Sequence, residues 1–190
     1  MPFTLLSTEA LRTVTVGEQQ TSRKGQKFSE IKFAGEQPCF QLSTEALFSP
    51  FRCGVYQGDG TETRLNLDLH ISDALRPILE AYDEFFAKEI KKLAPKANYH
   101  PLVQESDGGQ YPAKLRLKVN SQGQMAARIW RPDQTLAGNI KAVNTAGSRL
   151  IAIIIFSKIW FMGSIAGVTA ELRHAVLYEA TDIPDEVFPL

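Results

Sequence analysis

Residues 150–170, LIAIIIFSKIWFMGSIAGVTA, decide the fold. The segment is long and apolar enough to resemble a membrane-spanning helix. However, Lys158 lies near its middle, where a charge costs about 2.5–3.5 kcal/mol in a bilayer. β-branched and aromatic residues dominate the segment, and Met162-Gly163-Ser164 interrupts it. We therefore predict buried strands in a soluble protein that makes no contact with a membrane.

Further strands are expected on both sides of this segment. Apolar and polar residues alternate from Leu65 to Ile71, which indicates a strand with one buried face. The turn residues Gln57-Gly58-Asp59-Gly60 predict a hairpin that joins this strand to 51–56. The expected strands are 28–33, 39–42, 51–56, 63–71, 113–119, 125–130, 150–161 and 172–178.

One amphipathic helix is predicted between Ser72 and Pro95. Its apolar residues recur at three- and four-residue steps from Leu75 to Leu93, which gives one face for the core. Ser72 or Asp73 can cap its beginning, and Pro95 ends it. Strands, one helix and more strands predict a mainly β protein, an OB-fold-like β-barrel with the helix packed on it or inside it.

Three regions are expected along the chain: a loosely ordered segment at 1–27, a domain at 28–178 and an acidic tail at 179–190. Lys and Arg number 21, as do Asp and Glu, so the net charge is zero. The acidic residues of the tail are Glu179, Asp182, Asp185 and Glu186. Without these four, 21 basic residues face 17 acidic ones, so the body of the protein is mildly basic.

Cations alternate with aliphatic residues in the strand 113–119, so three of them share one face. In 125–130 and in 150–161, a cation and a tryptophan share a face. If these strands are neighbours, they form a surface of positive charge and flat rings. Cations neutralise phosphates and rings stack on unpaired bases, which suits a single-stranded nucleic acid, DNA or RNA. The candidate binding residues are Tyr111, Lys114, Arg116, Lys118, Arg128, Trp130, Arg131, Lys158 and Trp160.

A purely structural interpretation of these residues stays open. Lys and Arg are common on the exposed face of a half-buried strand, and lysine protects edge strands from aggregation. Trp130 and Trp160 are equally compatible with a place in the core, since most tryptophans are largely buried.

The order of several motifs resembles a known family. A turn at Tyr56-Gln57-Gly58-Asp59 precedes the helix, and a Tyr-Pro segment leads to 115–119. An apolar strand then ends at Lys158-Ile159-Trp160-Phe161, and Gly167-Val168 begins the final part. From 48 to 180 the chain resembles the OB-fold single-stranded-DNA-binding proteins of bacteriophages and large DNA viruses. The resemblance implies an OB barrel, sequence-tolerant binding and contacts with replication or recombination proteins.

The tail is the candidate contact for such partners. It is short, acidic and ends in apolar residues, as the family's tails do. An acidic tail can compete with nucleic acid for a basic groove, and its apolar tip can dock on a partner protein. The alternative is a solvated terminus without a role. The candidate tail residues are Asp182, Asp185, Glu186 and Phe188.

Two other functions are alternatives to nucleic-acid binding. An enzyme is not expected, because phosphate-loop, nucleophile-elbow and zinc-protease motifs are all missing, although Asp59, Asp68 and Glu105 could form a metal-dependent nuclease site. The second alternative is a viral structural or assembly protein, whose tryptophans would lie at subunit contacts.

The remaining expectations concern cofactors and context. The spacing of Cys39 and Cys53 matches no zinc pattern, so neither a metal nor a cofactor is expected. The three histidines are scattered along the chain. The N-terminus lacks a basic stretch followed by an apolar one, so we expect an intracellular protein, in the host cytoplasm or nucleus if it is viral. Whether it forms a homo-oligomer stays open.

Overall fold

A computed structural model of the chain describes residues 3–55 and 58–180. These residues form a mainly β protein with one α-helix, α1 (Arg76–Leu93), as the sequence predicted. The strands are β1 (Thr4–Leu5), β2 (Val14–Val16), β3 (Gln20–Thr21), β4 (Lys27–Phe33), β5 (Phe40–Gln41), β6 (Leu47–Phe48), β7 (Arg64–His70), β8 (Asn98–His100), β9 (Val103–Gln104), β10 (Lys114–Asn120), β11 (Arg128–Trp130), β12 (Leu136–Gly138), β13 (Arg149–Met162) and β14 (Ile165–Tyr178). Two short 3₁₀ turns lie at Thr8–Thr13 and Asp107–Gly109.

The apolar segment 150–170 folds as the long hairpin of β13 and β14, which confirms the prediction of strands. The two strands pair from Arg149 opposite Tyr178 to Met162 opposite Ile165. Gly163 makes the turn with a φ of 58°, which glycine adopts without steric cost. None of the helices among the described residues is long and apolar enough to cross a membrane.

The register of β13 against β14 shifts between Ile153 and Ile154, and it shifts again nearer the turn, between Phe156 and Lys158. Before this irregularity the even-numbered side chains point into the core, and after it Ile159 and Phe161 do. The extra residue of such a bulge turns the alternation over. Lys158 and Trp160 therefore share the outer face, as predicted.

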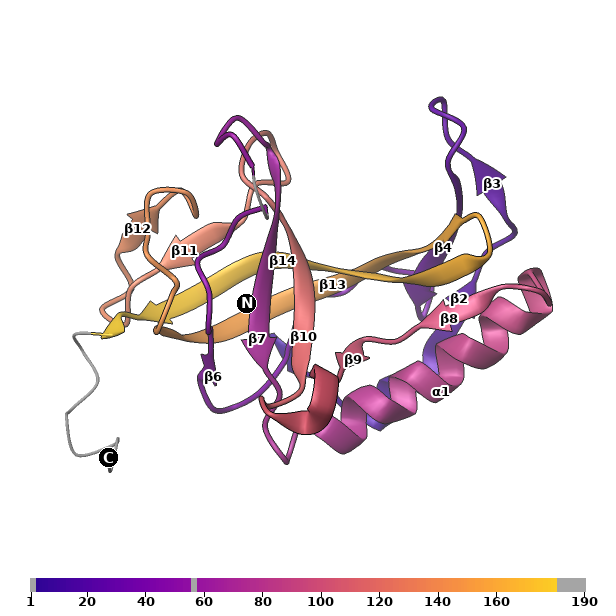
Figure 1. Ribbon diagram of the computed structural model, residues 1–190, viewed down its shortest axis with the longest axis horizontal. Helices are drawn as coiled ribbons and strands as arrows, with labels where there is room; N and C mark the ends of the chain where they lie inside the picture. The colour runs from indigo at the N-terminus through magenta and orange to yellow at the C-terminus, as the bar shows by residue number, and fades with distance from the viewer. Residues whose placement is uncertain (1–2, 56–57, 181–190) are drawn as a thin grey trace.

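The β13–β14 hairpin is the backbone of the sheet, and shorter strands attach to both of its edges. β13 pairs with β4, β5 and β6, whereas β14 pairs with β8, β10 and β11 at successive positions along its length. β10 continues into an antiparallel pair with β7. Figure 1 shows β7 and β10 running across the hairpin, with β11 and β12 beyond them.

Helix α1 lies along one side of the hairpin and closes part of the core (Figure 1). Leu79, Tyr82, Phe86 and Ile90 are buried, at the spacing of one helical face. The ring of Tyr82 stacks on Phe156 of β13 with 5.0 Å between centroids. The predicted C-terminal end holds, because the helix ends before Pro95. At the other end the helix begins at Arg76, and its N-cap is Leu75, without a side-chain cap, rather than Ser72 or Asp73; the Ser72 hydroxyl instead accepts a hydrogen bond from the Leu75 N–H in the preceding turn.

Two local predictions differ from the structure. The described part of 1–27 holds β1, β2, β3 and a 3₁₀ turn rather than a loose start, because Leu6 is 1% exposed and anchors it in the core. The predicted strand 51–56 is not a strand in its described part, where a single bridge joins Gly54 to Asn66. The Phe51 carbonyl instead accepts hydrogen bonds from the buried hydroxyls of Ser49 and Thr145.

The tail residues Asp182, Asp185, Glu186 and Phe188 lie outside the described residues.

Candidate nucleic-acid interface

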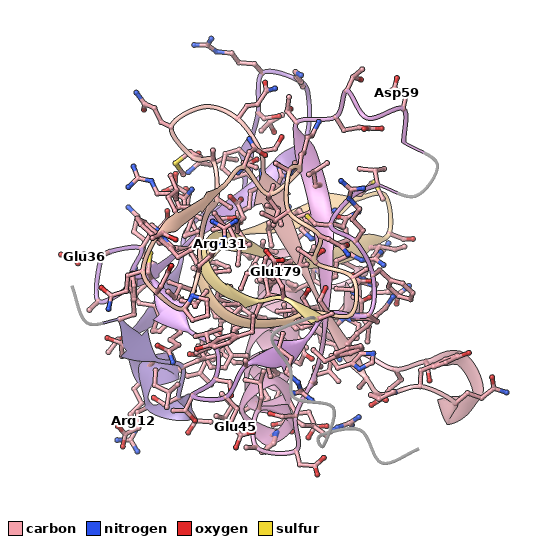
Figure 2. All side chains as sticks on the ribbon, turned by 90° about the vertical axis from the view of Figure 1, so that its left-hand side faces the viewer. Arg12, Glu36, Glu45, Asp59, Arg131 and Glu179 are labelled. Atoms are coloured by element: carbon pink, nitrogen blue, oxygen red, sulfur yellow. The ribbon has the colours of Figure 1, made fainter. Side chains whose placement is uncertain are left out.

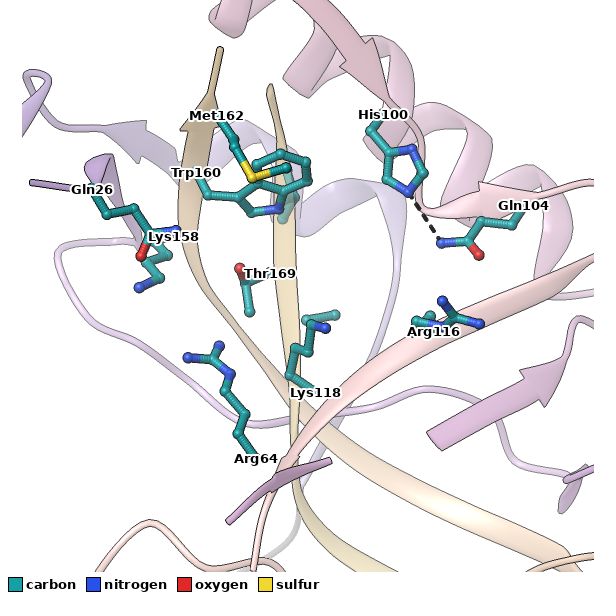
Figure 3. A pocket seen from close by; sticks show the side chains of 12 residues that line it. Gln26, Arg64, His100, Gln104, Arg116, Lys118, Lys158, Trp160, Met162 and Thr169 are labelled. Carbon is teal, nitrogen blue, oxygen red and sulfur yellow. Dashed lines mark hydrogen bonds between the residues drawn. The ribbon is translucent and has the colours of Figure 1, made fainter. Parts of the chain in front are cut away.

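A groove of about 420 Å³ crosses the outer face where β7, β10, β13 and β14 meet. Four cations and one tryptophan line it, and among the described residues of its lining none is acidic. Figure 3 shows these side chains directed into one hollow from different strands. The cations are Arg64, Arg116, Lys118 and Lys158, and the tryptophan is Trp160.

A nearly buried carboxylate, Asp68 of β7, holds two of the cations of β10 in place. Its oxygens accept hydrogen bonds from Lys114 Nζ at 2.8 Å and from Arg116 Nε and Nη2 at 2.7 and 2.9 Å. Burial opposes ionisation of Asp68, but these hydrogen bonds and the two positive charges outweigh it and lower its pKa. The sequence predicted that these cations share one face of the strand, and the structure adds that Lys114 and Arg116 share one carboxylate.

A second carboxylate, Glu171 of β14, lies opposite Lys118 of β10 in the register of the two strands and is 8% exposed. It accepts hydrogen bonds from Ser157 Oγ at 2.8 Å and Asn120 Nδ2 at 3.3 Å, and lies 3.6 Å from Arg64 Nη2. Asp68 and Glu171 together carry two negative charges against the five positive charges of Lys114 and the four lining cations. The cluster therefore keeps a net positive charge.

Lys118 stands at the middle of this cluster. Its Nζ donates a hydrogen bond to Asn66 Oδ1 at 2.6 Å. Partial burial, followed by repulsion from Arg64 and Arg116, lowers the pKa of Lys118. An anion in the groove would relieve this repulsion, so the site is electrostatically suited to phosphate.

Trp160 lies flat against β14 because its cross-strand neighbour is Gly167. A Cβ atom at Gly167 would lie only 2.7 Å from Cζ2 of the indole, so glycine is what permits this approach. His100 lies on another side, with 6.2 Å between ring centroids. The indole remains half-buried, and thus presents part of its ring to the groove.

Aromatic and polar side chains extend the groove at both ends. Lys158 Nζ lies 5.5 Å from the ring centroid of Phe28, within the range of a cation–π contact. At the other end, Gln104 Nε2 lies 3.4 Å from His100 Nε2. His100 and Gln104 come from the segment of β8 and β9, which packs beside α1 (Figure 1).

Asp83 of α1 fixes this segment. Its carboxylate accepts hydrogen bonds from the Tyr99 hydroxyl at 2.6 Å and from the N–H groups of Leu102 at 2.7 Å and Val103 at 3.1 Å. Burial raises the pKa of Asp83 although these hydrogen bonds oppose the rise. The helix thus positions one wall of the groove.

The structure brings together part of the predicted set. Arg116, Lys118, Lys158 and Trp160 meet in the groove, and Lys114 adjoins it through Asp68. Tyr111 is 70% exposed and lies in a neighbouring pocket.

The other three predicted residues lie further along the sheet. Arg128 and Trp130 of β11 pair with 174–176 of β14, beyond the pairing of β10 at 171–172, and Arg131 follows them. None of the three lines the groove. Figure 2 looks onto the end of the molecule where Arg131 and Glu179 lie.

Sequence reasoning missed several residues of the groove. Arg64 alternates with Leu65 in a strand that was predicted, so its outward direction could have been read from the pattern. Phe28 is distant in the sequence from His100 and Gln104, and none of the three carries a comparable signal.

No protein-family model matches the sequence, and neither does any curated protein. Among solved structures, the chain is similar to the single-stranded DNA-binding protein of bacteriophage Enc34 in complex with single-stranded DNA, with a TM-score of 0.49, 8% identity, and coverage of 90% of this chain and 98% of that one. It is also similar to gp2.5, a single-stranded DNA-binding protein encoded by bacteriophage T7, with a TM-score of 0.45, 13% identity, and coverage of 81% and 99%.

The match extends over most of the chain, and the resemblance predicted from the sequence is confirmed. A C-terminal truncation of the Enc34 protein is similar as well, with a TM-score of 0.47, 8% identity, and coverage of 87% of this chain and 95% of that one.

The three carboxylates of the alternative nuclease site, Asp59, Asp68 and Glu105, do not form one site. Asp59 accepts hydrogen bonds from Thr61, Asp68 binds the cations of β10, and Glu105 pairs with Arg76 at 2.7 Å. Within residues 3–55 and 58–180, no group of three or more His, Cys, Asp or Glu is arranged to hold a metal ion.

Proposed function

We propose that the protein binds single-stranded DNA with little regard to base sequence, in replication or recombination, and catalyses no reaction. The observation that carries the proposal is the half-buried indole of Trp160 in a groove lined by four cations and, among the described residues, by no carboxylate. Cations neutralise phosphates and release counterions, whereas an aromatic ring offers a stacking surface to any base.

The geometry favours a single strand over a duplex. The indole rests on Gly167, so a base that stacks on it meets a platform that is already in place. A duplex keeps its base faces inside, so Trp160 would contribute little to it. Both grooves of a duplex expose the edges of the bases rather than their faces. The indole of Trp160 therefore finds no base face to stack on.

Residues outside the groove are proposed to take part in binding as well. Arg128, Trp130 and Arg131 are proposed to contact a longer strand, because β11 continues the edge of β14 beyond β10. The sheet is proposed to close as an OB-type barrel. The segment 179–190 is proposed to contact partner proteins or to compete with DNA for the groove, since its charge is opposite to that of the groove.

Fluorescence titration with single-stranded and duplex oligonucleotides at several salt concentrations tests the proposal. If four cations each neutralise one phosphate, the affinity for a single strand falls with a log–log salt slope of about −3. A viral assembly protein held together by apolar contacts would lack this slope. Binding that is independent of salt, or equal for duplex and single strand, would contradict the proposal.

Substitution of Trp160 by alanine tests the stacking. We expect the affinity to fall about tenfold, since stacking contributes about 1–3 kcal/mol per base. Leu136→Ala is the matched control, because Leu136 is 55% exposed on β12 and lies outside the groove. Removal of 179–190 should tighten binding at low salt if the tail competes for the groove, and an unchanged affinity would assign the tail no part in binding.

A further inference from the structure

A second pocket, of about 620 Å³, lies between the loop after β6 and the loop before β10. Its size falls within the range of about 300–1,000 Å³ that is usual for small-ligand sites. Four of its ten lining residues are aromatic, and two of them, Phe48 and His70, lie 5.1 Å apart between ring centroids. Phe51 and Tyr111 stand at the opening, 60% and 70% exposed.

Such exposure is unusual for two large rings that lie together, because it leaves apolar surface in water. The backbone at Phe51 is nevertheless held in place by hydrogen bonds. The Phe51 carbonyl accepts hydrogen bonds from the buried hydroxyls of Ser49 at 3.0 Å and Thr145 at 3.2 Å. The rings are thus held at the opening of the pocket without a covering element among the described residues.

The loop that carries Tyr111 is fixed in the same way. Ser106 Oγ accepts a hydrogen bond from the Tyr111 N–H at 3.0 Å and donates one to its carbonyl at 2.8 Å. The adjoining Glu105 pairs with Arg76 of α1 through two contacts at 2.7 and 3.2 Å. The backbone that carries both rings is therefore preorganised, which lowers the entropic cost of binding a flat ligand between or upon them.

The pocket is continuous with the groove. Gln104 lines both of them, and Lys114 lines the pocket while it shares Asp68 with Arg116 of the groove. Lys114 Nζ also lies 5.9 Å from the ring centroid of Phe51. A strand that leaves Trp160 would therefore cross the cations of β10 before it reaches the second set of rings.

We propose that the pocket of Phe48, Phe51, His70 and Tyr111 takes an unpaired base of the same DNA strand that occupies the groove. This inference rests on the function proposed above. Rings at both ends and cations between them match a strand whose bases stack at two places and whose phosphates pass over β10. The charged residues of the lining are Lys114 and Glu105, and Glu105 is paired with Arg76 at 2.7 Å. Lys114 and the cations of the neighbouring groove favour an anionic chain, so the ligand is a nucleobase rather than an apolar side chain of a protein.

An abasic scan of an oligothymidylate tests this inference. A single abasic nucleotide is moved along the strand, and the affinity of the full-length protein is measured at each position. We expect two positions of loss, each about tenfold, one for each stacking site. Phe51→Ala combined with Tyr111→Ala should abolish only the second loss, and Trp160→Ala only the first.

The controls separate the two proposals. Leu136→Ala, at an exposed apolar site outside both hollows, should keep both losses. Tyr111→Phe keeps a ring and should keep the second loss, which rules out an effect of folding. A scan with a single, Trp160-dependent loss would overturn the second pocket and leave the proposed function intact. A scan without any Trp160-dependent loss would overturn the proposed function itself.

Discussion

Replacement of Gly167 by alanine tests how the groove presents Trp160. Gly167 lies in β14 directly opposite Trp160, and its backbone is in a conformation that alanine also adopts. A methyl group there would lie 2.7 Å from Cζ2 and 3.0 Å from Cε2 of the indole, and 3.1 Å from the His100 carbonyl oxygen. Ordinary contacts begin at 3.4 Å, so the indole has to move outward by about 0.7 Å.

The cost follows from this displacement. Overpacking of this kind destabilises a protein by about 1–3 kcal/mol, while alanine in place of glycine in a strand returns about 0.5–1 kcal/mol. We therefore expect the free energy of unfolding to fall by no more than about 2.5 kcal/mol. The affinity for single-stranded DNA should fall by up to about tenfold, because the shifted indole no longer matches the strand held by the cations.

Three measurements on the Gly167→Ala variant follow the effect: tryptophan emission, denaturant unfolding and single-strand titration. The emission should shift, because the environment of the indole changes. In a Trp160→Ala background the same change should leave the affinity nearly unaltered, since the clash with the indole is gone. Gly17→Ala is the matched control, because the nearest atom to its Cβ is an ordinary 3.7 Å away.

Two results would refute the reasoning. If Gly167→Ala lowers the affinity equally in the presence and absence of the indole, the loss does not come from Trp160. If the variant binds as tightly as the parent while its emission shifts, the position of the indole is irrelevant to binding. Either result would leave the cations as the sole support for the interface.

Two further predictions concern the charges of β7 and β10. Asp68→Asn should lower the free energy of unfolding by about 1–2 kcal/mol, because it removes the charged hydrogen bonds between Asp68 and the side chains of Lys114 and Arg116. The loss is limited because these two cations are themselves about a third exposed. The pKa of Asp68 is lowered in the fold, so this difference should be complete above pH 3.8 and vanish as the pH falls through the folded-state pKa, which denaturant unfolding at several pH values would show. The pKa of Lys118 is also lowered, so the affinity for single-stranded DNA should begin to fall with rising pH before the usual 10.5. Titrations between about pH 8 and pH 10 would show this loss, and Lys118→Arg should prevent it, because arginine stays charged; equal pH profiles would contradict the prediction.

Local patterns were sufficient for the longer elements of the fold, but they did not indicate the strands of two or three residues at β1, β2, β3, β6, β8, β9 and β12. Alternation of apolar and polar residues gave the strands that became β7 and β10, and three- and four-residue spacing gave α1. These patterns report burial, and burial of one face is a local property of a strand or helix. They failed at 51–56, where distant side chains take the backbone hydrogen bonds of the segment.

The candidate site could be predicted only in part, for the same reason. Alternation indicated that Arg116, Lys118, Lys158 and Trp160 point away from the core, and the structure agrees. It could not show whether those strands meet. β10 and β11 both pair with β14, but at different positions, which brings β10 to the groove and takes Trp130 away from it.

The sequence by itself determined which side chains would face outward, because strand geometry sends alternate residues to opposite faces whatever the strand's partners are. Only the tertiary structure decided which of them became neighbours. Lys158 and Lys118 meet because their strands flank β14, and Asp68 and Glu171 lie beneath them because β7 and β14 supply the adjoining positions. Pairing between strands far apart in the chain depends on the sum of many contacts, so no short stretch of sequence contains it.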